Sequence, residues 1–181
     1  MARIRPAVST CAVFQIRDLQ LEDREALGAM LDAADYPTWA EDYRRWQLLK
    51  PAWRFDPAVH ASRILIAVDG ESVIGVIEGR PPRDHSEETW GRSLPAPHGW
   101  IDRLVVARER RHQGIATALV DAYSAWIAER GAGSVATWVF EGEPETEVVV
   151  RRAFFASYGF RQLGDPDHYI MGGPLTDRPD I

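Results

Sequence analysis

Residues 104–117, with the sequence LVVARERRHQGIAT, are the most informative part of the chain. The apolar run at 104–106 indicates the end of a buried strand, and an arginine-rich turn follows it. Gly114 and Ala116 then stand in the first turn of an expected helix. The first amides of a helix have no partners within it, and the helix dipole is positive at that end. Because small residues let a ligand approach the backbone closely, this segment predicts a phosphate or pyrophosphate site.

The flanking sequence gives the segment a structural setting. Residues 100–106 are expected to form a strand, and residues 114–130 a long helix that ends at Gly131. The apolar stripe of that helix consists of Ile115, Leu119, Tyr123, Trp126 and Ile127. Upstream, two β-branched runs at 64–68 and 73–78 are joined through Asp69-Gly70, a dipeptide typical of a tight hairpin turn.

The remaining segments complete an α/β domain. Residues 145–157 are ambiguous, because the valines at 148–150 favour a strand, whereas the length and the acidic start after Pro144 favour a helix; we expect the helix. The other expected elements are a strand at 13–17, helices at 21–34 and 40–49, a long loop at 80–98, a strand at 134–140 and one closing strand within 161–171. The order β-α-α-β-β-β-α-β-α-β predicts a mixed, mostly antiparallel sheet flanked by helices.

Composition limits the function classes. With 181 residues and 45% hydrophobic content, we expect a single domain over 1–181 with its core at about 13–171. The net charge of −6 argues against nucleic acid or an anionic membrane as a partner, since both attract positive surfaces. Cys11 is the only cysteine, and no metal-ligand cluster stands out among the five histidines. A poor signal peptide at 1–16 makes a cytoplasmic location the expectation, and a homodimer is compatible with the sequence.

The 104–117 segment resembles the acyl-CoA signature of the GNAT superfamily of N-acyltransferases, Gln/Arg-x-x-Gly-x-Gly/Ala. Its three defined positions are filled by Arg111, Gly114 and Ala116. The flanks agree as well, because Leu104-x-Val106 matches the family's strand end and Gly159-Phe160 matches the Gly-Phe after its last helix. The likeness covers roughly 13–171 and is clearest between 100 and 160. A solvated arginine-rich turn would predict neither this spacing nor these flanks.

The resemblance implies acetyl-CoA as co-substrate and an amine of a small molecule or peptide as acceptor. In the family, two strands splay apart and expose backbone groups to the pantetheine arm. Leu104 and Val106 should supply these groups here, with one amide polarising the thioester carbonyl. The expected cofactor-binding residues are Leu104, Val105, Val106, Arg111, His112, Gln113, Gly114, Ile115, Ala116 and Thr117.

Candidates for the general base precede the strand end. The attacking amine must be neutral, so a base has to take its proton directly or through water. Asp102 and His98 are the best placed, and Glu78 on the neighbouring strand is a third candidate. Asp102 could instead pair with an arginine, and His98 could belong to the loop surface.

The residue that protonates the leaving thiolate does not stand at the family's usual position. The family commonly has a tyrosine four residues before the Gly of Gly-Phe, and this chain has Phe155 there, which cannot donate a proton. Tyr158 is the substitute candidate, although a core or capping role also suits it. The family's pantetheine-contacting asparagine is replaced by Val148.

Two function classes therefore remain open from the sequence. The first is an acetyl-CoA-dependent N-acetyltransferase. The alternative is a non-catalytic module that binds or senses acyl-CoA, which the absent tyrosine favours. The sequence does not favour a different class of enzyme that binds a phosphate-containing ligand, because neither Gly-x-x-x-x-Gly-Lys-Ser/Thr nor Gly-x-Gly-x-x-Gly occurs.

Overall fold

The computed structural model describes residues 14–49, 62–88, 90–139, 145–164 and 169–175. Over these residues the strands form one seven-stranded sheet in the order β1-β2-β3-β4-β5-β7-β6. The elements along the chain are β1 (Gln15–Asp18), η1 (Leu21–Asp23), α1 (Arg24–Ala33), α2 (Pro37–Leu49), β2 (Arg63–Asp69), β3 (Ser72–Arg83), η2 (Gly91–Ser93), β4 (His98–Val106), η3 (Arg108–Arg110), α3 (Ile115–Ala128), β5 (Ser134–Trp138), α4 (Glu145–Ser157), β6 (Arg161–Leu163) and β7 (Ile170–Pro174). This is the predicted mixed, mostly antiparallel fold.

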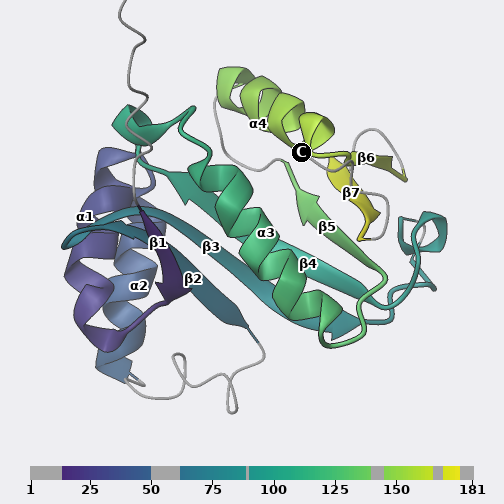
Figure 1. Ribbon diagram of the computed structural model, residues 1–181, viewed down its shortest axis with the longest axis horizontal. Helices are drawn as coiled ribbons and strands as arrows, with labels where there is room; N and C mark the ends of the chain where they lie inside the picture. Colours follow the sequence, from purple (N-terminus) through teal and green to yellow (C-terminus); the bar gives the residue numbers. More distant parts are fainter. Residues whose placement is uncertain (1–13, 50–61, 89, 140–144, 165–168, 176–181) are drawn as a thin grey trace, which may run out of the picture.

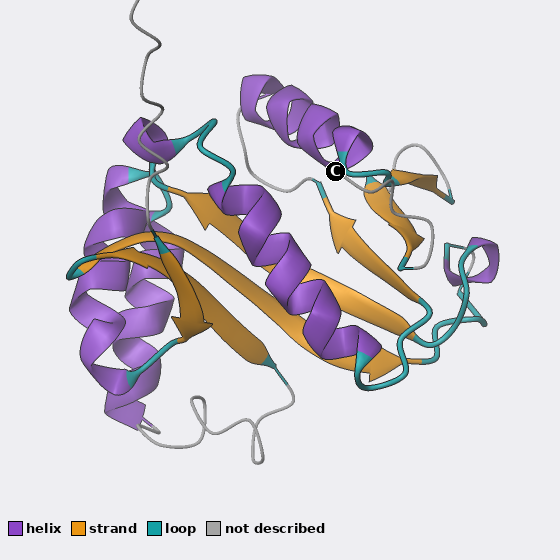
Figure 2. Ribbon diagram, viewed as in Figure 1, coloured by secondary structure: helices purple, strands orange, loops and turns teal. Residues whose placement is uncertain are grey.

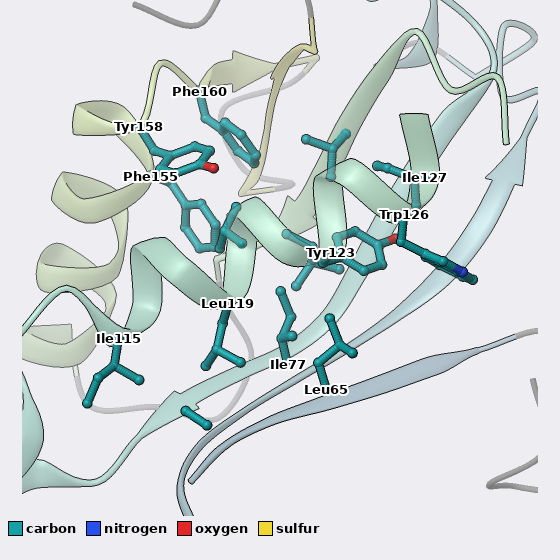
Figure 3. Close-up of a cluster of buried hydrophobic side chains, with 14 of the residues drawn as sticks. Leu65, Ile77, Ile115, Leu119, Tyr123, Trp126, Ile127, Phe155, Tyr158 and Phe160 are labelled. Carbon is teal, nitrogen blue, oxygen red and sulfur yellow. The ribbon is translucent and has the colours of Figure 1, made fainter. Parts of the chain in front are cut away.

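Helices cover both faces of the sheet (Figure 1). On one face, α1 and α2 pack over β2 and β3 around buried Leu27, Leu31 and Tyr43. On the other, α3 crosses the sheet (Figure 2). The apolar stripe predicted for α3 packs in one cluster with buried side chains of the strands. The aromatic rings at the end of α4, Phe155 among them, pack against this α3 cluster (Figure 3). The sheet therefore has a large apolar core on each face, and a smaller buried cluster lies around Trp90, Leu94 and Trp100.

The pairing of β4 with β5 ends early and opens the sheet. These two strands are parallel from His98↔Ser134 to Ile101↔Thr137, and the Thr137 hydroxyl donates to the Ile101 carbonyl at 3.0 Å. Strand β5 ends at Trp138, whereas β4 continues to Val106. The edge of β4 from residue 102 to 106 thus has no partner in β5, which is the splay expected from the resemblance.

A bulge interrupts the pairing of β4 with β3 at the same place. Ile101 pairs with Gly79 and Arg103 pairs with Glu78, so Asp102 is the extra residue. The buried Tyr123 hydroxyl of α3 accepts from the Trp100 amide at 3.1 Å and contacts the Arg80 carbonyl at 2.7 Å. Gly79 lies under this ring, because a Cβ there would come within 2.4 Å of a Tyr123 carbon. Tyr123 therefore holds the bulge in place.

Most of the predicted elements are confirmed, and two expectations were wrong in detail. Strand β3 continues into the expected loop and pairs Arg83 with His98, while the two prolines at 81–82 fall in an irregularity of the pairing. Proline has no N–H to give to a ladder, so its presence suggested a loop. The single closing strand is two short strands, β6 and β7, which pair antiparallel. Segment 145–157 is the helix α4, as expected.

Candidate active site

The turn between β4 and α3 has the backbone form that the sequence suggested. His112 and Gly114 both have positive φ values, 63° and 79°. Gly114 is the residue preceding α3, and no side chain caps the first amides of this helix. Nothing lies within 4 Å of a Cβ built on Gly114. The positive end of the α3 dipole therefore faces open space.

A cavity of about 480 Å³ opens at this turn. It runs along the unpaired edge of β4, past the start of α3, to one face of α4. Its lining residues are Tyr36, Leu104, Val105, Val106, Arg110, Arg111, His112, Gly114, Ile115, Ala116, Thr117, Val150, Arg151, Ala153, Phe154 and Ser157. Of the ten residues predicted to bind the cofactor, only Gln113 is missing from this lining; its amide donates to the Glu109 carbonyl at 3.3 Å.

The charged side chains that line the cavity are all positive. Among the described residues that line it there are three arginines and no carboxylate. Arg110 is held by Asp69 at 2.6 Å, and Arg151 donates to the Tyr36 hydroxyl at 2.7 Å. The remaining wall is largely apolar, as with Leu104 and Phe154. A cationic end beside an apolar channel suits a ligand that joins a phosphate group to an uncharged arm.

Asp102 lies on the bulge at the start of the unpaired β4 edge. Its carboxylate forms two contacts with Arg80, at 2.9 and 3.1 Å, and its side chain is 31% exposed. Burial raises the pKa of Asp102 above its ordinary value, Arg80 opposes that rise, and the nearby Glu78 adds to it. The Arg80 guanidinium also lies over the Trp100 ring, 5.5 Å from its centroid. The predicted arginine pair is thus present, and it leaves the carboxylate partly accessible.

His98 lies at the opposite end of β4 from the cavity. It is fully buried, its Nδ1 accepts from the His85 amide at 3.3 Å, and its Nε2 faces the Gly91 carbonyl at 3.0 Å. Leu104 is six residues further on, which is about 20 Å of extended chain. His98 is therefore not loop surface; it organises the segment before β4, and the structure does not bring it to the cavity.

Glu78 is more buried than Asp102. Its side chain accepts from the Tyr43 hydroxyl at 2.6 Å and lies 3.6 Å from Arg103, whose guanidinium covers the Trp39 ring at 5.0 Å. This group joins α2 to the sheet beside the bulge.

The two aromatic residues considered for the acid are directed into the core. Phe155 is 1% exposed and packs on Phe160. The Tyr158 hydroxyl donates to Asp121 of α3, and Tyr158 is not among the lining residues. The valine expected to replace the asparagine, Val148, is buried and also lies outside the lining.

Comparison with known proteins decides the family. The model of the acetyltransferase (GNAT) family matches residues 16–160. The chain belongs to this family. The match spans β1 to the end of α4 and so includes every residue of the cavity wall. No curated protein matches the sequence significantly.

Solved structures share the fold of this GNAT acetyltransferase. PaiA N-acetyltransferase of Thermoplasma acidophilum, in complex with coenzyme A, has a TM-score of 0.67 at 20% identity, covering 90% of this chain and 99% of that one. A GNAT acetyltransferase of Brucella melitensis, in complex with acetyl-CoA, has a TM-score of 0.56 at 17% identity, covering 93% and 92%. The ribosomal-protein-S18-alanine N-acetyltransferase of Escherichia coli has a TM-score of 0.61 at 13% identity, covering 93% and 97%.

Seven residues of the GNAT cavity wall were not in the predicted set: Tyr36, Arg110, Val150, Arg151, Ala153, Phe154 and Ser157. Tyr36 and Arg151 are 115 positions apart and meet only because the fold brings α4 to the connection between α1 and α2. Within the described ranges, no group of three His, Cys, Asp or Glu could hold a metal ion, and no helix has the length and apolar character to cross a bilayer.

Proposed function

We propose that this GNAT acetyltransferase moves an acetyl group from acetyl-CoA to an amine of a small molecule or a peptide. The observation that carries the proposal is the cavity, with the uncapped start of α3 and two arginines of the turn, Arg110 and Arg111, at its cationic end and the unpaired β4 edge along its apolar channel. Coenzyme A joins a pyrophosphate to an uncharged pantetheine arm. The negative pyrophosphate matches the arginines and the helix start, and the uncharged arm matches the apolar channel.

Each part of the wall has a role in the proposal. The amides that begin α3, with Arg111, hold the pyrophosphate. The backbone of Leu104 and Val106 pairs with the amides of the pantetheine arm, as a strand would. One β4 amide polarises the thioester carbonyl, where negative charge develops as the amine attacks.

Asp102 is the proposed base. It stands on the bulge where β4 and β5 part, two residues before Leu104, the first β4 residue of the cavity wall; Asp102 itself is not among the lining residues. A carboxylate whose pKa is raised by burial takes a proton from an ammonium more effectively than an ordinary aspartate does. The ionised form, favoured by Arg80, is the one that accepts the proton.

A thiol-release assay tests the proposed function. The full chain is incubated with acetyl-CoA and a panel of polyamines, aminoglycosides, amino-acid amides and short peptides, and free thiol is measured. We expect amine-dependent release with at least one acceptor. Binding of acetyl-CoA without release across the whole panel would favour the non-catalytic module, for which the buried Phe155 is the supporting observation.

A further inference from the structure

The leaving thiolate needs a proton. Three of the described tyrosines do not line the cavity, and their hydroxyls form contacts elsewhere. Phe155 has no hydroxyl, and the hydroxyls of Tyr43, Tyr123 and Tyr158 contact Glu78, backbone carbonyls and Asp121, respectively. Among the described residues that line the cavity, Tyr36 is the only phenol.

The position of Tyr36 is fixed from both sides. It lies between α1 and α2, where its amide donates to the Leu31 carbonyl at 2.8 Å. Its ring stacks on Trp39 with centroids 4.6 Å apart and planes 17° apart. The preceding residue, Asp35, forms an ion pair with Arg108 of η3, which anchors the connection to the turn at the mouth of the cavity. A backbone hydrogen bond and a ring contact therefore place Tyr36 in the wall of the cavity.

Arg151 supplies the second half of the arrangement. It lines the same cavity from α4, one helical turn before Phe155, and its guanidinium donates to the Tyr36 hydroxyl oxygen at 2.7 Å. A guanidinium at this distance stabilises the phenolate that remains after a tyrosine gives up its proton. The pair thus combines a proton donor with a fixed positive charge.

We infer that Tyr36, supported by Arg151, protonates the thiolate of coenzyme A, replacing the tyrosine absent at position 155. This inference rests on the proposed function. The amine nitrogen attacks the thioester carbon, the C–S bond breaks, and sulfur leaves with the bonding electrons. Sulfur then takes the Tyr36 hydroxyl proton and becomes the thiol. The proton lost by the amine passes to Asp102, and the Tyr36 phenolate is reprotonated from solvent.

One test needs no acceptor. The thiol of coenzyme A bound to the full chain is titrated through its thiolate absorbance and its rate of alkylation by iodoacetamide. A hydroxyl that donates to sulfur stabilises the thiolate, so in Tyr36→Phe the bound thiol should titrate about one pH unit higher than in the wild type. Tyr158→Phe is the comparison variant and should leave the titration unchanged. The same titration in Tyr36→Phe and wild type, or a change in Tyr158→Phe alone, would overturn the assignment.

The kinetic test uses the acceptor found in the thiol-release assay. Tyr36→Phe should lower kcat by about 100-fold, within the usual range for loss of a general acid, while KM for acetyl-CoA changes little. A rise in KM for the amine with kcat intact would make Tyr36 an acceptor-binding residue and refute the inference.

The two proposals fail in different ways. If coenzyme A does not bind to the wild type, the proposed function fails and this inference falls with it. If the wild type binds and transfers acetyl groups while Tyr36→Phe matches it in kcat and in the thiol titration, only the inference fails.

Discussion

At the residue scale, the backbone of Gly114 is the strongest evidence for a ligand site at the start of α3. Its φ of 79° and the open space around it leave room for a ligand at the start of α3. The sequence could predict this residue, because the Gly-x-Ala spacing reflects a local requirement of the turn. It could not show that His98 is enclosed at the far end of β4, since that depends on contacts with residues 85 and 91.

Gly114→Asp is expected to abolish acetyl-CoA binding by placing bulk and negative charge in the cationic end of the cavity, where the phosphates would lie. The matched control is Gly131→Asp, because Gly131 has a φ of 82° and equally open surroundings at the other end of α3. Both substitutions should cost about 1–2 kcal/mol of folding free energy through the left-handed backbone. Calorimetry should show binding lost in the first variant and kept in the second; equal loss in both would point to a general effect on α3.

The raised pKa of Asp102 predicts a pH dependence of turnover. The base acts when deprotonated, so the wild-type rate should rise as the pH passes upward through that pKa. Asp102→Asn should lower kcat by about 100-fold near neutral pH, with partial recovery at high pH, where the free amine is abundant. A variant that loses stability and keeps its rate would make Asp102 an ion-pair partner of Arg80 only.

Arg80→Gln is the companion to that experiment. This substitution removes the ion pair but keeps the Asp102 carboxylate. It therefore distinguishes the effect of the Arg80 charge on turnover from the effect of losing the base. Because Arg80 opposes the rise in the Asp102 pKa, its loss should move the acidic limb of the pH–rate profile to higher pH. Asp102→Asn should remove that limb. Identical profiles for the two variants would contradict the assignment.

At the element scale, local pattern was a good guide wherever an element carries its own signal. The hairpin of β2 and β3 and the apolar stripe of α3 both appear as predicted. The exceptions lie where pairing with a neighbouring strand determines the structure of the segment. Strand β3 passes through two prolines because β4 continues beside it, and the closing segment folds back on itself to pair β6 with β7.

The junction of β1 with α1 should depend on Asp23. Its carboxylate accepts from Arg17 at 2.5 and 2.7 Å and from the Gln20 amide at 2.8 Å, and the Arg17 contacts hold its pKa below the usual range. Stability from a depressed pKa is present above the unfolded-state value and is lost as pH falls through the folded one. Asp23→Asn should therefore lower the free energy of unfolding by roughly 1–3 kcal/mol at pH 7.

Urea denaturation at neutral and acidic pH measures this effect. The difference between wild type and Asp23→Asn should shrink as the pH falls below the depressed pKa of Asp23. Asp32→Asn is the control, since its pair with Arg44 is also short, at 2.6 Å, but half exposed, and such pairs contribute about 0–1 kcal/mol. Equal losses in the two variants would show that the Asp23 contacts add nothing beyond a surface pair.

At the scale of the whole molecule, the site is assembled from segments that are far apart in the chain. Arg151 meets Tyr36 across 115 positions, and Arg108 meets Asp35 across 73. A single sequence gives no signal for such contacts, because each residue alone looks like ordinary surface. The cationic end of the cavity, formed by the turn between β4 and α3, lies in contrast within one continuous stretch, and for that reason it could be predicted.

Calorimetric titration of acetyl-CoA into the full chain tests the central claim most directly. We predict one site per chain, weaker binding as salt screens the arginines, and no binding in Gly114→Asp. The absence of any binding heat in the wild type at about 1 mM acetyl-CoA, a concentration at which even weak complexes form, would contradict the account.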